Sequence, residues 1–168
     1  HGVLDDHARA VFQGKIVVQA GAQKSDGHQL NRALLLSDAA EIDFARATVV
    51  VRGGERPAAE SAAERVLIEE VSRKTGLAWN STTEWPGKEA TAIIALSVKS
   101  APPAWKGQLP AEALTAATLE AAEGFSIRVQ ARTANQPAMV FVTGADPRGL
   151  LFGVGKLLRS ANWGPNRW

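Results

Sequence analysis

The sequence predicts an α/β fold, an α+β sandwich in which two main helices pack on a mixed, mostly parallel sheet with one antiparallel hairpin. Residues 48–98 read as strand, helix and strand, an order that normally closes with a right-handed crossover and places the two strands parallel. Residues 124–130 alternate apolar and polar side chains, and a short turn leads back into the apolar run 138–143. The alternation and the turn together predict the hairpin.

The first half of this core begins with the β-branched strand 48–52. A helical pattern covers residues 57–75, with Gly76 in the usual stop position, and the buried strand 91–98 follows it. The helix carries an apolar stripe made of Ala59, Ala62, Ala63, Val66, Leu67 and Val71. One face of the helix is therefore expected to lie on the sheet.

The second half ends in a strand-to-helix unit over residues 137–160. Asp146 is predicted to cap the helix with its side-chain oxygen, and Pro147 fits the first helical position, where a missing N–H costs nothing. Gly149 and Gly153 lie four residues apart beside a leucine-rich stripe. Since each glycine costs about 1 kcal/mol against alanine in a helix, we interpret the pair as points of close packing against the sheet or a neighbouring domain.

The remaining segments are predicted more coarsely. Residues 1–46 are expected to form an N-terminal arm, with one weak strand at 15–19 and a loosely helical pattern at 29–40. A short strand is expected at 77–80 and a short surface helix at 111–122. The domain organisation is then an arm, an α/β domain over 47–160, and a linker over 161–168.

Composition excludes several classes of function. The hydrophobic fraction of 45% and charged fraction of 21% are typical of a folded, soluble domain. The net charge of +2 arises from charges spread along the chain, so nucleic acid is not expected as a partner. No apolar run approaches a membrane-spanning length, so no membrane is expected either. The sequence has no cysteine, which rules out disulfides and thiolate metal sites.

Motifs for chemistry fail when their positions are checked. The glycines around Lys156 do not form a phosphate-binding loop, because leucine stands at two required positions. A histidine-ligated copper site at His1 would need a sandwich of alternating strands, and a cleavage scar is the preferred interpretation. Glu69 and Glu70 stand four residues before Arg73 and Lys74 and are read as a solvated, ion-paired face. We therefore assign no catalytic, cofactor-binding or metal residue.

Tryptophan is unusually frequent, with five residues against no tyrosine. Trp85 and Trp105 fall in predicted loops, and Trp163 and Trp168 fall in the C-terminal tail. Exposed indole rings can stack on sugars, but a tryptophan in a loop more often fills the edge of a core or a domain interface. We favour the interface interpretation and keep sugar stacking as the alternative.

The ordered set of segments resembles a known domain family. The helix ESAAERVLIEEVSRKTGLAW, the strand TAIIALSV, the strand EGFSIRV and the unit VFVTGADPRGLLFGVGKLLR resemble the N-terminal domain that precedes the catalytic barrel in several glycoside hydrolases. The β-N-acetylhexosaminidases and α-glucuronidases are examples. Phe152 occupies the aromatic place of their G-x-D-x-R-G-x-x-Y-G-x-x-x-L-L pattern.

This resemblance implies a hexosaminidase-like, non-catalytic accessory domain that supports a TIM barrel of the same polypeptide. Because the sequence begins with His1 and stops at Trp168 without a closing element, we expect a processed chain or a fragment that lacks the barrel. The resemblance also implies a secreted or periplasmic, polysaccharide-degrading protein. A free-standing carbohydrate-binding module is the alternative, and a small stand-alone enzyme is the least supported reading.

Overall fold

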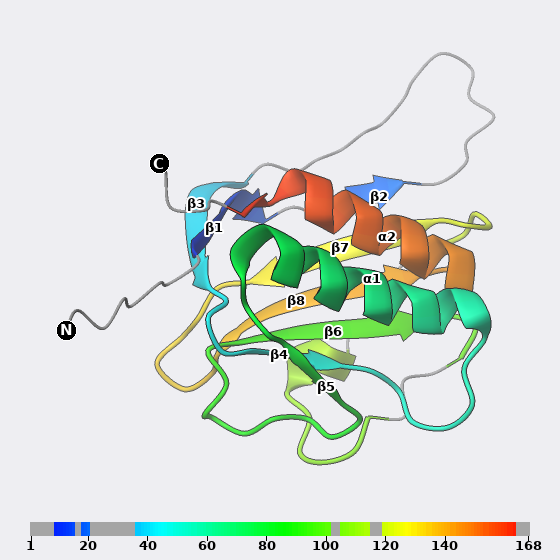
Figure 1. Cartoon of the computed structure of the whole chain (residues 1–168), viewed down its shortest axis with the longest axis horizontal. Helices are drawn as coiled ribbons and strands as arrows, with labels where there is room; N and C mark the ends of the chain where they lie inside the picture. Colours follow the sequence, from blue (N-terminus) through cyan, green and yellow to red (C-terminus); the bar gives the residue numbers. More distant parts are fainter. Residues whose placement is uncertain (1–8, 16–17, 21–35, 102–104, 115–118, 164–168) are drawn as a thin grey trace.

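The computed structural model describes residues 9–15, 18–20, 36–101, 105–114 and 119–163, and Figure 1 shows the arrangement of the elements. A six-stranded mixed sheet forms the centre of the molecule. Its strands, in spatial order, are β2 (Val18–Ala20), β7 (Phe125–Gln130), β8 (Ala138–Gly144), β6 (Ala92–Val98), β4 (Ala47–Val50) and β5 (Asn80–Thr82). The α/β class with a mixed sheet and two helices is confirmed.

The two central strands set the register of the sheet. β6 and β8 run parallel, from the pair Ala92 and Ala138 to the pair Val98 and Gly144. β4 and β5 continue the parallel part, whereas β7 pairs antiparallel with β8, and β2 pairs antiparallel with β7. Every residue of β6 is buried, as expected for a strand that is covered on both faces.

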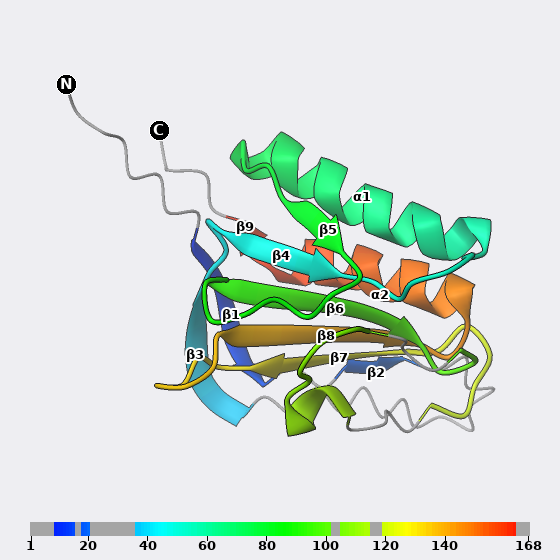
Figure 2. The same ribbon diagram turned by 90° about the horizontal axis from the view of Figure 1, so that it is seen from below.

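Two helices cover one face of this sheet, as Figure 2 shows from below. α1 (Ala58–Thr75) buries Ala63, Leu67 and Val71, and Gly76 ends it in the left-handed conformation with φ of 76°. α2 (Pro147–Ser160) buries the residues that line its inner side: Gly149, Leu150, Gly153, Val154, Leu157 and Leu158. These apolar stripes and the facing strand residues form the main core.

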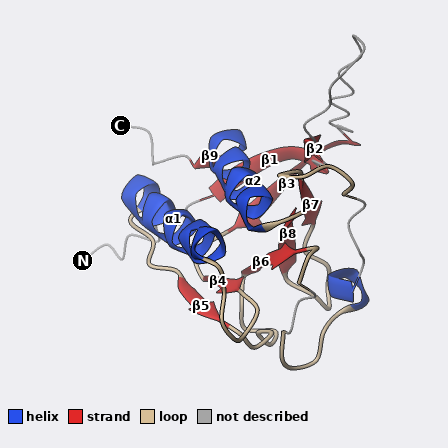
Figure 3. Ribbon diagram, turned by 90° about the vertical axis from the view of Figure 1, so that its right-hand side faces the viewer, coloured by secondary structure: helices blue, strands red, loops and turns tan. Residues whose placement is uncertain are grey.

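A second, smaller core fills the opposite face of the sheet. Met139 and Phe141 of β8 and Ile93 of β6 pack there beneath Trp105 and Ala113. Ala113 belongs to the 3-10 helix η1 (Ala111–Leu114), which Figure 3 shows on the other side of the strands from α1 and α2. The segment after β6 therefore acts as a cover for the second face.

A three-stranded sheet joins the two ends of the described chain. It consists of β3 (Leu36–Asp43), β1 (Arg9–Lys15) and β9 (Asn162–Trp163), with β1 in the middle and both pairings antiparallel. Ala10 lies opposite Trp163, so a strand close to the N-terminus pairs with the residues that directly follow α2.

Several predicted elements differ from the structure. The loosely helical interpretation of residues 29–40 is wrong where the chain is described, because β3 occupies its second part; residues 21–35 lie outside the described residues. The strand expected at 77–80 forms later, as β5. In the described part of the segment 111–122, the expected helix is replaced by η1 and residues 119–122 are not helical, whereas residues 115–118 lie outside the described residues. Alanine content alone did not indicate that this segment covers a sheet face.

No helix in the described part of the chain is both long enough and apolar enough to span a bilayer.

Candidate functional site

The carboxyl ends of the parallel strands are the usual place for a ligand in an α/β sheet. Polar side chains follow each of the three inner parallel strands here: Arg52 after β4, Lys99 after β6 and Asp146 after β8. This edge of the sheet is therefore the candidate site.

Asp146 binds two backbone N–H groups from different segments. Its Oδ1 accepts from Gly149 N at 2.8 Å, which caps α2, and its Oδ2 accepts from Glu123 N at 2.8 Å. Pro147 occupies the first turn of the helix. These hydrogen bonds, first from Gly149 and then from Glu123, lower the pKa of the Asp146 carboxyl below its ordinary value of 3.8. The carboxylate thus ties the turn before β7 to the start of α2.

Glu123 completes this junction. It adopts a positive φ of 58°, the only such non-glycine residue in the described chain, and its carboxylate lies 2.7 Å from Arg148 Nη1. Both side chains are well exposed, so the ion pair itself contributes little to stability. Because a left-handed backbone costs roughly 1 kcal/mol for a non-glycine residue, the bond from Glu123 N to Asp146 offsets local strain.

We expect Asp146→Asn to destabilise the protein by about 1 kcal/mol near neutral pH, because the Asn oxygen can still cap α2 but the Asn amide nitrogen cannot accept the bond from Glu123 N. Since the folded-state pKa of Asp146 is depressed, its contribution is fully present above the unfolded value of 3.8 and is lost as the pH falls through the lower folded value. Urea unfolding of both proteins from pH 7 to pH 2 measures this. A difference that grows on acidification would contradict the assignment.

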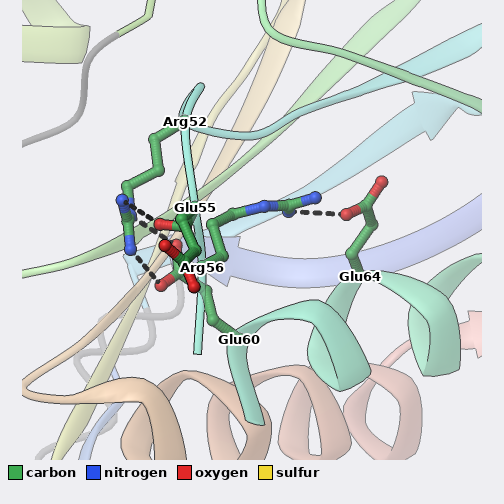
Figure 4. A network of polar contacts seen from close by, with 5 residues as sticks. All are labelled: Arg52, Glu55, Arg56, Glu60 and Glu64. Atoms are coloured by element: carbon green, nitrogen blue, oxygen red, sulfur yellow. Dashed lines mark hydrogen bonds and ion pairs between the residues drawn. The ribbon is translucent and has the colours of Figure 1, made fainter. Parts of the chain in front are cut away.

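Arg52 is held in a second polar network, shown in Figure 4. Its Nε and Nη2 donate to the two carboxylate oxygens of Glu60 at 2.8 and 2.9 Å, and its Nη1 donates to the Glu55 carbonyl at 3.1 Å. Only 3% of the Glu60 side chain is exposed. Arg56 Nη1 donates to Glu64 Oε2 at 2.6 Å beside it. The network fastens the β4–α1 loop to the first turns of α1.

The Arg52–Glu60 pair was not predicted, although the sequence contains a signal for it. Glu60 precedes Ala63, Leu67 and Val71 by three, seven and eleven residues, which places a carboxylate on the buried stripe of the helix. A buried carboxylate needs a charged partner. The exposed face also differs in detail from the expectation, since Arg73 pairs with Glu70 and Lys74 Nζ donates to the Leu158 carbonyl.

The other polar groups at this edge are bound internally as well. The hydroxyls of Ser97 and Thr143 lie 3.0 Å apart across β6 and β8, and Lys99 Nζ donates to the Leu119 carbonyl at 2.6 Å. No group of three His, Cys, Asp or Glu residues in the described ranges could hold a metal ion. Each of these side chains stabilises the fold, and none pairs a nucleophile with a base.

The structure brings two of the singled-out tryptophans together. The ring centroids of Trp85 and Trp105 are 5.3 Å apart, and Trp85 stacks on Phe141 with centroids 6.2 Å apart. The Arg128 guanidinium lies 4.5 Å from the centre of the Phe141 ring on the same face of the sheet. Trp105 is 8% exposed. Trp105 belongs to the second core, and the partly buried Trp85 packs against it.

The two other tryptophans are placed apart from this cluster. Trp163 lies in β9, where its backbone pairs with Ala10, and Trp168 lies outside the described residues. Gly149 and Gly153 lie on the inner side of α2, where a Cβ on Gly149 would fall 2.2 Å from the Gly124 carbonyl oxygen. Gly149 therefore packs closely against the backbone that directly precedes β7 of the same chain.

The fold and the site define an α/β protein in which the polar side chains at the carboxyl ends of the parallel strands bond to other groups of the same chain. Comparison with known proteins adds a family likeness. A family profile described as SUF system FeS cluster assembly, SufBD core domain, matches residues 1–45. An iron–sulfur cluster assembly SufBD family protein of Synechocystis sp. is 46% identical over 41 residues, which cover 24% of this chain. The match spans 9% of that relative's length, so the chain resembles a small part of it.

This finding corrects the resemblance to glycoside hydrolases. The likeness is to an iron–sulfur cluster assembly family, and it falls in residues 1–45, ahead of the segments that suggested a hydrolase. Those segments have local explanations: Asp146 caps α2, and Gly149 and Gly153 permit close packing. Such features recur wherever a helix follows a strand tightly, so they report packing and not hydrolase function.

The functional conclusions drawn from that resemblance are wrong as well. The likeness to the SUF system overturns three expectations: the non-catalytic hydrolase domain, the catalytic barrel of the same polypeptide and the carbohydrate partner. The alternative carbohydrate-binding module is withdrawn on the same finding. The secreted or periplasmic localisation had rested on the resemblance alone.

Proposed function

We propose that this chain acts in iron–sulfur cluster assembly as a partner-binding component that does not hold the cluster through its own thiolates. The observation that carries the proposal is the match of residues 1–45 to the SufBD core domain of the SUF system. The Synechocystis relative supports the same assignment.

The position of the matched segment favours a role in protein contacts. It supplies the whole of β1, β2 and β3, so it contributes to both sheets of the molecule. β3 is an outer strand of the small sheet and, among the described strands, pairs with β1 alone. An outer strand exposes backbone N–H and C=O groups to which a partner can add a strand.

The side chains that this chain can offer as cluster ligands favour a role in which a partner, and not this chain, holds the cluster. Cysteine thiolates are the usual ligands of iron–sulfur clusters, and the sequence contains none. The cluster is therefore a cargo that a partner would hold, while this chain contributes to the assembly surface. We further propose that residues 1–46 act as the contact segment, residues 47–160 as the α/β domain, and residues 161–168 as a linker whose first part is held to the contact segment by the pairing of β9 with β1.

Binding to purified SUF assembly proteins from the source organism tests the function. We expect the full chain to co-elute with a SUF component in anaerobic size-exclusion chromatography. Val11→Pro should abolish co-elution, because Val11 pairs with Glu41 of β3 and Asn162 of β9, and proline removes a backbone donor from the ladder.

Lys88→Pro is the matched control. Lys88 is exposed in a turn, and its N–H donates to no backbone carbonyl in the described part of the chain, so proline is tolerated there. Co-elution that survives Val11→Pro, or absence of any complex with the unmodified chain, would refute the proposed function. Circular dichroism of both variants separates lost binding from lost folding.

A further inference from the structure

The outer face of α2 carries positively charged side chains, no negatively charged one, and an exposed aromatic ring. Arg148, Phe152, Lys156 and Arg159 stand at spacings of four, eight and eleven residues, which place them on one side of the helix, opposite its buried leucines. We call these four residues the α2 outer face. Phe152 is 44% exposed and is the single exposed large hydrophobic residue among those whose side chains the structure describes.

The charges of this face are not balanced. The sequence of α2 contains three basic residues and no acidic residue. Arg148 alone meets an acid, the half-exposed Glu123, and neither Lys156 nor Arg159 forms an ion pair with any described residue. The neighbouring helix α1 instead carries acids and bases together, with Glu70 bonded to Arg73.

Helix stability explains only part of this arrangement, because Arg159 stands in the last turn of α2, where the helix dipole favours a positive charge. Arg148 stands in the first turn of α2, where the helix dipole disfavours a positive charge. Gly155 brings the Arg159 guanidinium back along the helix, since a Cβ there would lie 3.1 Å from Arg159 Nη1. The face is also rigid, because the inner side of α2 is packed on β7 and β8.

We propose that the α2 outer face docks an acidic helix of a partner protein, with carboxylates facing Arg148, Lys156 and Arg159 and an apolar side chain covering Phe152. Charge complementarity identifies this occupant. A bilayer fits less well, because an interfacial helix inserts a whole apolar face and that of α2 is already buried in the core. The proposal concerns residues outside the SufBD-matched segment and is independent of the proposed function.

The test uses the full chain and a fluorescently labelled synthetic helical peptide with glutamates on both sides of a central leucine. Anisotropy titrations should show binding that weakens with salt. Replacing both Lys156 and Arg159 by Glu should lower the affinity by at least about tenfold, and Phe152→Ala by about fivefold.

Arg65→Glu is the control, since Arg65 is an exposed cation of α1 whose replacement makes the same charge reversal at one residue that the test variant makes at each of two. It should leave the affinity within about twofold of the starting protein. No binding of the peptide, an equal loss with Arg65→Glu, or no effect of Phe152→Ala would overturn the proposal. Tighter binding to phosphatidylglycerol vesicles than to the peptide would also overturn it.

Discussion

Alanine at Gly149 is expected to destabilise the protein by about 3 kcal/mol, in spite of its higher helix propensity. The added Cβ would lie 2.2 Å from the Gly124 carbonyl oxygen, and backbone on both sides of this contact leaves little freedom to move. That carbonyl already accepts a hydrogen bond from Ala145 N at 2.8 Å. The helix must therefore shift away from the start of β7, which opens the main core.

Gly153→Ala should cost less, about 1 to 2 kcal/mol, because its Cβ would meet side-chain atoms of Val142 at 2.8 Å and Phe125 at 3.2 Å, which can adjust. Gly155 is the matched control in the same helix. Its Cβ would meet the mobile guanidinium of Arg159 at 3.1 Å, so alanine should stabilise by up to about 1 kcal/mol.

Guanidinium unfolding of the three variants measures this order. Equal effects of Gly149→Ala and Gly155→Ala would show that propensity, and not close packing, governs the helix.

Loss of Glu60 is expected to have a comparable effect. Glu60→Ala should destabilise by about 3 kcal/mol, because it leaves Arg52, itself only 15% exposed, without its bidentate partner. Most of this loss of stability should come from the charge of Arg52, which is left largely buried without a charged partner. Arg52→Met combined with Glu60→Leu should therefore recover most of the lost stability, since an apolar pair of similar size replaces both ions.

Glu70→Ala supplies the comparison. Glu70 also bonds an arginine in two places, Arg73 Nε and Nη2, but on the solvent side of the same helix. Its loss should change stability by no more than about 0.5 kcal/mol. Thermal unfolding of Arg52→Met, of Glu60→Leu and of the double variant measures the coupling free energy between Arg52 and Glu60. If the effects of Arg52→Met and Glu60→Leu simply added in the double variant, a direct interaction would be contradicted.

The sequence predicts the central elements well because each has a strong local cause. Gly76 in the left-handed conformation ends α1 as expected, and Asp146 and Pro147 stand at the start of α2. The parallel pairing of β4 with β6 agrees with the order of strand, helix and strand, since a helical crossover returns the chain to the start of the sheet for the next strand. The hairpin of β7 and β8 follows from alternation and a short turn.

The parts that escaped prediction depend on contacts between distant residues. β3 lacks a strong strand pattern and forms by pairing with β1. Trp85, in the loop between β5 and β6, stacks on Phe141, and it meets Trp105 only because the segment after β6 folds back over the second face. The bond from Glu123 N to Asp146 Oδ2 joins residues 23 apart, and no local pattern indicates it. Function was mistaken for a related reason, since packing features were read as a family signature.

The pairing of β1 with β9 has a consequence for how the protein is made. Ala10 and Trp163 are about 150 residues apart, so closing this contact carries a large entropic cost and comes late in folding. On the ribosome β1 emerges early, whereas β9 emerges only after α2. Until then one edge of β1 has no strand of its own chain to pair with, and during synthesis that edge is open to chaperones and to other chains.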